Sequence, residues 1–97
     1  MHYVIIVGGG TVGYTVGKML ENEGYAVTII EKDRNRAEFL LQDTHSHVII
    51  GDATNPWVLE SAEIKKASYL IAVTGDDKTN VIASILAKHY GVENIIT

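Results

Sequence analysis

The sequence contains no cysteine among its 97 residues. This absence excludes disulfide bonds, a thiolate nucleophile and any metal centre that depends on cysteine ligands. It fits a protein of the cytoplasm, where thiols stay reduced and disulfides are rare.

Long apolar runs are also missing. No stretch approaches the length of about 20 apolar residues that a membrane-spanning helix needs. The first predicted strand starts at Tyr3, which leaves no room for a signal peptide. We therefore expect no direct membrane insertion, and we expect any role at a membrane to be that of a soluble partner.

An excess of basic residues is likewise absent. The chain carries 8 Lys and Arg against 12 Asp and Glu, for a formal net charge of −4. This balance argues against a general binder of nucleic acid or of acidic membranes. A local phosphate site remains compatible with it, because backbone amides can carry that binding.

Apolar strands alternate with helical patterns along the chain. Strands are predicted at residues 3–7, 26–30, 47–50, 69–73 and 94–97. Helices are predicted at residues 11–23, at 34–43, from 56, and from 76 or 77 to about 90. Strands separated by such helices indicate βαβ units, and right-handed crossovers then give an α/β, Rossmann-like doubly wound parallel sheet in the order 3-2-1-4-5.

The domain organisation follows from the length. Residues 1–97 form a single small domain that buries about 60–65% of its unfolded surface. The sheet is expected to be truncated after strand five, where a sheet of this kind usually continues to a sixth strand. The chain is then either a fragment of a longer protein or a minimal domain that a partner completes.

Apolar spacing predicts the inner faces of the helices. The first helix is expected to place on one face Val12, Val16, Met19 and Leu20. The second is expected to turn inward Ala37, Leu40 and Leu41, and the fourth repeats at helical spacing Val81, Ile82, Ile85 and Leu86. The predicted N-caps are Asp33, Asn55 before Pro56, and Asp76 or Asp77. Trp57 is interpreted as a packing residue.

A buried strand runs directly into a glycine loop. Gly8, Gly10 and Gly13 fit the spacing G-x-G-x-x-G, which allows a tight turn, close approach to a pyrophosphate and close contact of helix with strand. The following helix points its amide groups and positive dipole end at the phosphates. Gly17, one turn later, is expected to let this helix lie close to the sheet. The loop predicts a nucleotide site and leaves open whether the protein performs chemistry.

An acidic residue follows the second strand. Glu31 lies eighteen residues past Gly13, where a carboxylate accepts hydrogen bonds from the ribose hydroxyls of adenosine. It would repel a 2′-phosphate, so NAD or an adenine nucleotide is favoured over NADP. Lys32 beside it weakens this choice slightly. Arg34 or Arg36 either reaches the adenosine side of the crevice or simply belongs to a charged helix start.

Two further loops complete the predicted crevice. Asp52 could bind the adenine edge and Ala53 could leave space for the ring; an equally good interpretation is a turn capped by its own Asp and Thr. Thr74 and Gly75 would line the opposite wall. The carboxylates that follow, at positions 76 and 77, suggest a helix cap, a cation site or an acid/base pair. No His or acid stands at a useful spacing from them, so no catalytic residue is predicted.

Histidine spacing does not predict a metal site. His45 and His47 would point to one face of a strand, but this pair falls one ligand short, and His2 and His89 do not complete it.

The four loops together are more specific than any one of them. Val-Gly-Gly-Gly-Thr-Val-Gly, Ile-Ile-Glu-Lys-Asp, Gly-Asp-Ala-Thr-Asn-Pro and Ala-Val-Thr-Gly-Asp-Asp-Lys-Thr-Asn closely resemble the N-terminal NAD-binding domain of Trk-type potassium-uptake regulators, the RCK or KTN family. The resemblance covers essentially the whole chain. It implies a non-catalytic regulatory domain on the cytoplasmic side of a potassium channel or transporter.

The resemblance also implies a ligand and partners. Such domains bind NAD(H) or ATP/ADP, assemble into dimers or rings, and couple ligand binding to gating of a membrane subunit. The ligand contacts that the resemblance implies, with Lys32 added beside the ribose, are Gly8, Gly10, Thr11, Val12, Gly13, Glu31, Lys32, Asp52, Ala53, Thr74, Gly75 and Asn80.

Two departures from the family pattern bear on the ligand and the assembly. Some ATP-responsive members carry Arg within the glycine loop, whereas position 11 is Thr, which favours NAD or NADH. A sixth strand, the crossover helix used in dimerisation and a second ligand domain are not present in these residues. The alternative function is the cofactor-binding half of an NAD-dependent dehydrogenase, for which the sequence offers no acid/base residue and no substrate domain.

Overall fold

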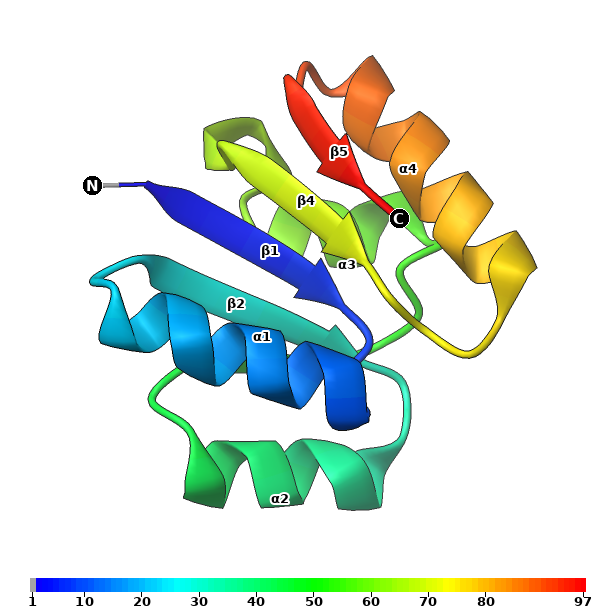
Figure 1. Cartoon of the computed structure of the whole chain (residues 1–97). Coiled ribbons are helices and arrows are strands. Elements are labelled where there is room, and N and C mark those ends of the chain that lie inside the picture. The colour runs from blue at the N-terminus through cyan, green and yellow to red at the C-terminus, as the bar shows by residue number, and fades with distance from the viewer. Residues whose placement is uncertain (1) are drawn as a thin grey trace.

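The computed structural model describes residues 2–97 and places one parallel sheet between two layers of helices (Figure 1). The strands are β1 (Tyr3–Val7), β2 (Ala26–Glu31), β3 (His47–Ile50), β4 (Tyr69–Ala72) and β5 (Asn94–Ile96). The helices are α1 (Thr11–Asn22), α2 (Arg34–Asp43), α3 (Pro56–Ser61), the single 3-10 turn η1 (Ile64–Lys66) and α4 (Asp77–His89). The strand order β3-β2-β1-β4-β5, with all neighbours parallel, confirms the predicted doubly wound α/β sheet.

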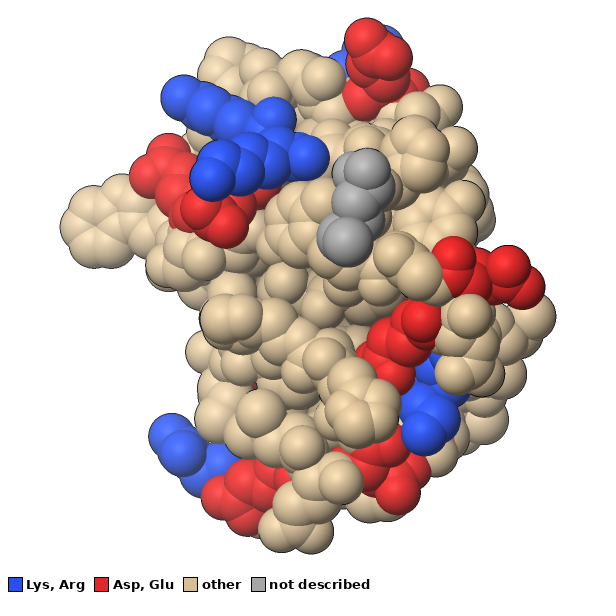
Figure 2. Space-filling model, turned by 90° about the vertical axis from the view of Figure 1, so that its left-hand side faces the viewer, with Lys and Arg blue, Asp and Glu red and all other residues tan. Residues whose placement is uncertain are grey.

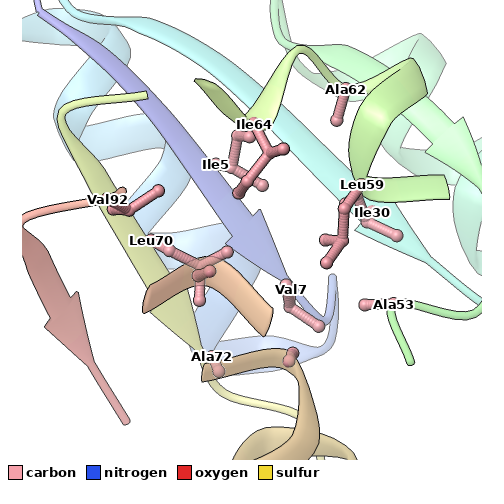
Figure 3. Close-up of a cluster of buried hydrophobic side chains, with 12 residues drawn as sticks. Ile5, Val7, Ile30, Ala53, Leu59, Ala62, Ile64, Leu70, Ala72 and Val92 are labelled. Atoms are coloured by element: carbon pink, nitrogen blue, oxygen red, sulfur yellow. The ribbon is translucent and has the colours of Figure 1, made fainter. Parts of the chain in front are cut away.

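The central strand β1 contributes side chains to both layers. Ile5 and Val7 join a cluster with α3 and α4, and Val4 and Ile6 join a cluster with α1 and α2. These four side chains are at most 2% exposed. A strand covered on both faces reads as an unbroken apolar run, which is why the sequence showed it so clearly. Figure 3 shows the first cluster, where side chains from β1, β2, β4, α3 and η1 converge.

Two glycines face the sheet from α1. Gly13 and Gly17 are the buried residues of this helix. A Cβ at Gly13 would lie 2.9 Å from the carbonyl carbon of Gly8 and closer still to its oxygen, so no side chain fits there. A Cβ at Gly17 would meet Ile29 and Ile6 at 3.4 and 3.5 Å, which is ordinary contact. Close approach of helix and sheet therefore requires glycine at position 13 and only a small residue at 17.

The predicted inner face of α1 is wrong at two positions. Val12 is 56% exposed and Met19 is 62% exposed, whereas Val16 and Leu20 pack against the cluster beneath the helix. The reason is that the two glycines occupy the centre of the inner face. With them turned toward the sheet, Val12 and Met19 lie on the flanks of the helix.

The inner faces of α2 and α4 are also built partly from small residues. In α2, Ala37 and Leu40 are buried as predicted, but Leu41 is 54% exposed. In α4 the buried residues are Ala83 and Ala87. Leu86 packs against the core cluster as predicted, whereas three other predicted residues of α4 point outward and are 42–63% exposed: Val81, Ile82 and Ile85.

Side chains cap three of the four helices. Asp33 caps α2, Asn55 caps α3 ahead of its proline, and Asp76 rather than Asp77 caps α4. By contrast, α1 has no side-chain cap and no acidic residue in its first turn. Its first amide groups are therefore open to an external acceptor.

The end of the molecule at which the strands begin is shown in Figure 2. Lys and Arg side chains form small groups on this face, each beside Asp or Glu side chains, so the face carries no continuous basic surface. Within residues 2–97, no helix combines the length and the apolar character needed to cross a membrane.

Candidate functional site

The loops after β1, β2, β3 and β4 surround a crevice of about 280 Å³ at the carboxyl ends of the strands. The crevice lies where the strand order reverses, beside β1 and β4, which is where open α/β sheets bind ligands. A larger hollow of about 470 Å³ lies at the opposite end of the strands, lined in part by Tyr25 and His47. Among its described lining residues that hollow has no glycine loop and no α-helix N-terminus, so the crevice is the candidate site.

The glycine loop forms one wall of the crevice. Gly8 has φ of 101°, a conformation that favours glycine, and a Cβ there would lie 2.9 Å from Cγ2 of Thr74. The Gly8 N–H donates to the carbonyl of Ile30 (2.8 Å), which ties the loop to β2. Gly10 then stands at the N-cap of α1. The loop thus brings bare backbone to the crevice wall and directs the open end of α1 toward it.

Glu31 links the glycine loop to the turn after β2. Its Oε1 accepts the N–H of Gly9 (2.7 Å), and its Oε2 accepts the N–H of Asp33 (2.8 Å). Each carboxylate oxygen has two lone pairs, so both can accept a further hydrogen bond from a ligand. The two backbone bonds fix the carboxylate at the edge of the crevice, where a diol would meet it.

Gly9 has a structural role that the motif spacing does not assign. A Cβ at this position would collide with Cδ1 of Leu40. The run of three consecutive glycines was the available signal, because the motif itself needs only two of them. Behind the loop, Arg36 donates from Nε to the Gly9 carbonyl (2.6 Å) and does not line the crevice. Neither Arg36 nor the exposed Arg34 reaches the adenosine side.

Asp52 is held by its own turn. Its Oδ1 accepts hydrogen bonds from the N–H (2.9 Å) and the hydroxyl (2.8 Å) of Thr54. These bonds hold the pKa of Asp52 below its ordinary value, because they favour the ionised form. Its Oδ2 lies 3.8 Å from Nζ of Lys32 across the crevice mouth, an exposed pair that contributes little stability. The turn interpretation therefore holds, and Asp52 also lines the crevice.

Asn80 holds the loop after β4 from behind. Its Oδ1 accepts from the N–H (3.0 Å) and the hydroxyl (2.7 Å) of Thr74, and its Nδ2 donates to the Thr74 carbonyl (3.1 Å). Asp76 accepts a hydrogen bond from the Thr79 hydroxyl (2.7 Å), which lowers the pKa of Asp76. The wall formed by the loop after β4 is therefore held mainly by the Asn80 side chain of α4.

Most residues predicted to contact a ligand line the crevice. These are Gly8, Gly10, Glu31, Lys32, Asp52, Ala53, Thr74 and Gly75. Thr11, Val12 and Gly13 form the first turn of α1, where their backbone amides rather than their side chains are available as hydrogen-bond donors. Asn80 lies behind the wall. Lining residues that were not predicted as contacts include Val7, Ile30, Asp76 and Thr79. The first two stand at strand ends, which is the signal that could have identified them.

The histidines do not assemble a metal site. Among residues 2–97, no group of three or more His, Cys, Asp or Glu side chains is placed to hold a metal ion.

The glycine loop, the acid after β2 and the two further loops together match one protein family. Residues 4–97 match the TrkA-N domain. The chain belongs to the TrkA-N domain family. The resemblance to Trk-type potassium-uptake regulators is thereby confirmed.

This TrkA-N domain is similar to longer curated proteins. It is 47% identical over 95 residues to a Trk system potassium uptake protein TrkA homolog of Pyrococcus horikoshii. The match covers 98% of the chain and 41% of that relative. The chain thus spans about two fifths of the length of this curated relative.

Two solved structures share the fold of this TrkA-N domain. Shewanella denitrificans Kef CTD in AMP-bound form is 32% identical, with a TM-score of 0.79 over 97% of the chain and 57% of that chain. The GsuK channel bound to NAD is 16% identical, with a TM-score of 0.81 over 98% of the chain and 21% of that chain. At 16% identity, the second likeness shows the fold alone.

Proposed function

We propose that this TrkA-N domain is a non-catalytic, nucleotide-binding regulatory domain of a potassium channel or transporter. The observation that carries the proposal is the open N-terminus of α1. It is the one major helix without a side-chain cap, and the glycine loop leads it to the crevice that Glu31 borders. An anion-binding helix end beside a fixed carboxylate suits a ligand with phosphates at one end and a ribose diol at the other.

The charges at the two ends of the crevice support one orientation of the proposed ligand. The phosphates lie against the backbone amides of Gly10, Thr11, Val12 and Gly13, where no acidic side chain opposes them. The ribose hydroxyls donate to Glu31, and the adenine lies beside Asp52 and Ala53 with the loop of Thr74 opposite. Glu31 and Asp52 then face the uncharged adenosine rather than the phosphates.

Adenosine 5′-phosphate is the part of the ligand that the crevice recognises. NAD, NADH, AMP, ADP and ATP all contain it, and AMP and NAD are the ligands named for the two solved structures above. Glu31 disfavours a 2′-phosphate, so NAD(H) or another adenine nucleotide is favoured over NADP(H). Threonine at position 11 provides no cation for a third phosphate, so we propose NAD or NADH as the ligand, with ATP/ADP as the alternative.

A regulatory role fits the crevice better than catalysis does. Among its described lining residues there is no His, Cys or Tyr. The pKa values of Asp52 and Asp76 are held low by hydrogen bonds, which makes both carboxylates poor general acids or bases near neutral pH. The alternative, a dehydrogenase half, would need its acid/base residue and its substrate pocket from another domain.

Two kinds of partner are proposed, a membrane subunit on the basis of the family and further copies of the domain on the basis of the outward face of α4. The name of the Pyrococcus horikoshii relative places it in a potassium uptake system, and the chain covers 41% of it. We propose that this domain works on the cytoplasmic side of a potassium-transporting membrane subunit. Copies of the domain assemble as a dimer or ring, for which the outward apolar residues of α4 offer contact area: Val81, Ile82 and Ile85.

Regulation then works by population shift. A nucleotide biases the assembly only by its differential affinity for two arrangements, and a tenfold difference corresponds to about 1.4 kcal/mol. That size of effect tunes a transporter without locking it.

Binding is tested by titrating the purified chain with NADH, NAD, ADP, ATP and NADPH. Trp57 is the only tryptophan; it is 78% exposed rather than packed, which makes the packing interpretation wrong. It lies on α3 just after the Asp52 loop, so energy transfer to NADH reports binding. We expect micromolar affinity for NADH or an adenine nucleotide and much weaker binding of NADPH. No calorimetric heat and no thermal shift with any of them would overturn the proposal. NADH turnover with simple carbonyl acids would favour the enzyme instead.

A further inference from the structure

Two successive peptide units of the glycine loop are fixed from opposite directions. The N–H of Gly9 donates to Oε1 of Glu31 (2.7 Å), while the carbonyl of Gly9 accepts from Nε of Arg36 (2.6 Å). The first bond fixes the peptide between residues 8 and 9, and the second fixes the peptide between residues 9 and 10. Both are charge-assisted hydrogen bonds, which are shorter and stronger than neutral ones.

The second bond determines where the amide of Gly10 points. A trans peptide is planar, so its C=O and its N–H point in opposite directions. Arg36 lies outside the crevice and holds the Gly9 carbonyl on that side, whereas Gly10 lines the crevice. The Gly10 N–H is therefore directed away from Arg36, toward the crevice and the first turn of α1.

Arg36 is itself held in place. Its guanidinium carbon lies 4.6 Å from the ring centroid of Phe39 and 5.7 Å from that of Tyr14. Its backbone N–H donates to the capping side chain of Asp33 (2.8 Å). Aromatic contacts hold the planar guanidinium in a way that a lysine ammonium could not reproduce. The donor thus reaches the loop already oriented, rather than as a free surface side chain.

We propose that Arg36 is a positioning residue for phosphate binding: by holding the Gly9 carbonyl it keeps the Gly10 amide aimed at the nucleotide, without touching the ligand. This inference rests on the proposed function, because it assumes that the crevice binds a nucleotide. It assigns a binding role to a residue that lies behind the crevice wall and that the glycine spacing does not include.

The test compares two ligands and two arginines. Arg36→Gln removes the hydrogen bond and the charge, Arg36→Lys keeps the charge, and Arg34→Gln removes a charge from an exposed position on the same helix turn. ADP carries phosphates and adenosine carries none. We expect both Arg36 variants to bind ADP about tenfold more weakly, the effect of one charge-assisted hydrogen bond, with adenosine affinity unchanged. Arg34→Gln is expected to bind both ligands as the wild type does.

Several results would overturn the inference. Equal losses in Arg34→Gln and Arg36→Gln would show a general charge effect. Equal losses for ADP and adenosine, or a lower melting temperature with unchanged affinity, would show a structural role only. If wild-type protein binds ADP and both Arg36 variants bind it equally well, the inference alone fails. If the wild-type protein binds no nucleotide, the proposed function fails.

A second readout needs no ligand. In the nucleotide-free protein, the amide resonances of Gly9 and Gly10 report the two fixed peptide units. We expect Arg36→Lys, the milder change, to shift both resonances and to leave that of Gly17 unchanged. Unchanged Gly9 and Gly10 resonances would show that Arg36 does not set the loop geometry, whether or not the glutamine variant folds.

Discussion

Replacing Gly13 with alanine is predicted to destabilise the domain by about 3 kcal/mol, the upper part of the range for overpacking. The added Cβ would lie 2.9 Å from the carbonyl carbon of Gly8 and closer to its oxygen. Those atoms are backbone, so no side-chain rotation can relieve the collision. Either α1 moves away from the sheet or the glycine loop changes its path, and either shift also removes the phosphate-binding geometry.

Gly17→Ala is the matched control, the same substitution one turn later on the same helix face. Its Cβ would meet Ile29 at 3.4 Å and Ile6 at 3.5 Å, both ordinary contacts. Alanine is favoured over glycine in a helix by up to about 1 kcal/mol, so this variant should be as stable as the wild type or more stable. The two substitutions therefore move stability in opposite directions.

Thermal unfolding followed by circular dichroism measures both variants. For a domain of this size, 1 kcal/mol corresponds to a melting-temperature shift of about 4–8 °C, so Gly13→Ala should melt well over 10 °C below wild type. Equal stability of the Gly13→Ala and Gly17→Ala variants would refute the reasoning, since it would show that α1 does not press on the glycine loop.

Three further predictions concern the crevice walls. Asn80→Ala removes the three hydrogen bonds that hold Thr74; it should lower the free energy of unfolding by about 1–2 kcal/mol and weaken NADH binding several-fold, as urea unfolding and calorimetry would show. Thr79 holds the pKa of Asp76 below its unfolded value, so ionised Asp76 stabilises the folded state above about pH 4, and this stabilisation is lost as the pH falls through the folded pKa. The melting temperature of Thr79→Ala should therefore fall less in acid than that of the wild type. Thr11→Arg places a cation at the first turn of α1 and should raise ATP affinity about tenfold relative to NADH in competition titrations.

Each of these has a result that would contradict it. Wild-type stability in Asn80→Ala would show that the Thr74 loop is held by its backbone alone. Identical acid melting curves for wild type and Thr79→Ala would remove the hydroxyl as the cause of the low pKa. An unchanged preference between ATP and NADH in Thr11→Arg would show that the side chain at position 11 does not reach the phosphates.

The order of the sheet was predictable because its signals are local and strong. The apolar run from Val4 to Val7 marks a strand buried on both faces, and alternation with helices restricts the chain to parallel neighbours. The glycine spacing and Glu31 predicted a crevice at the carboxyl ends of the strands, and the structure has a crevice there. Parallel strands gather their following loops at one edge, so a correct strand order brings the loops together.

The helix faces were less predictable because small residues, rather than the most hydrophobic ones, face the sheet. Ala83 and Ala87 lie inside while Ile85 lies outside, since small residues let α4 approach the sheet. Apolar spacing alone selects the isoleucine side. Apolar spacing does not show whether a helix face packs on the sheet of its own domain or on another surface.

Roles that depend on contacts between distant residues could not be predicted from spacing. A side chain at Gly9 would press on Leu40, which is far along the chain, and Arg36 meets the loop only in the folded state. Similarly, the 3-10 turn η1 follows from Glu63 adopting φ of 57°, which a non-glycine residue rarely does and no local pattern announced.

The most direct test of the central claim is an NMR titration of the isotope-labelled chain with NADH. We expect saturable shifts of the amides of Gly10 to Gly13, of Glu31 and of Thr74, with little change in the amino-end hollow that includes Tyr25 and His47. Shifts centred on that hollow, or no saturable shifts anywhere, would contradict it.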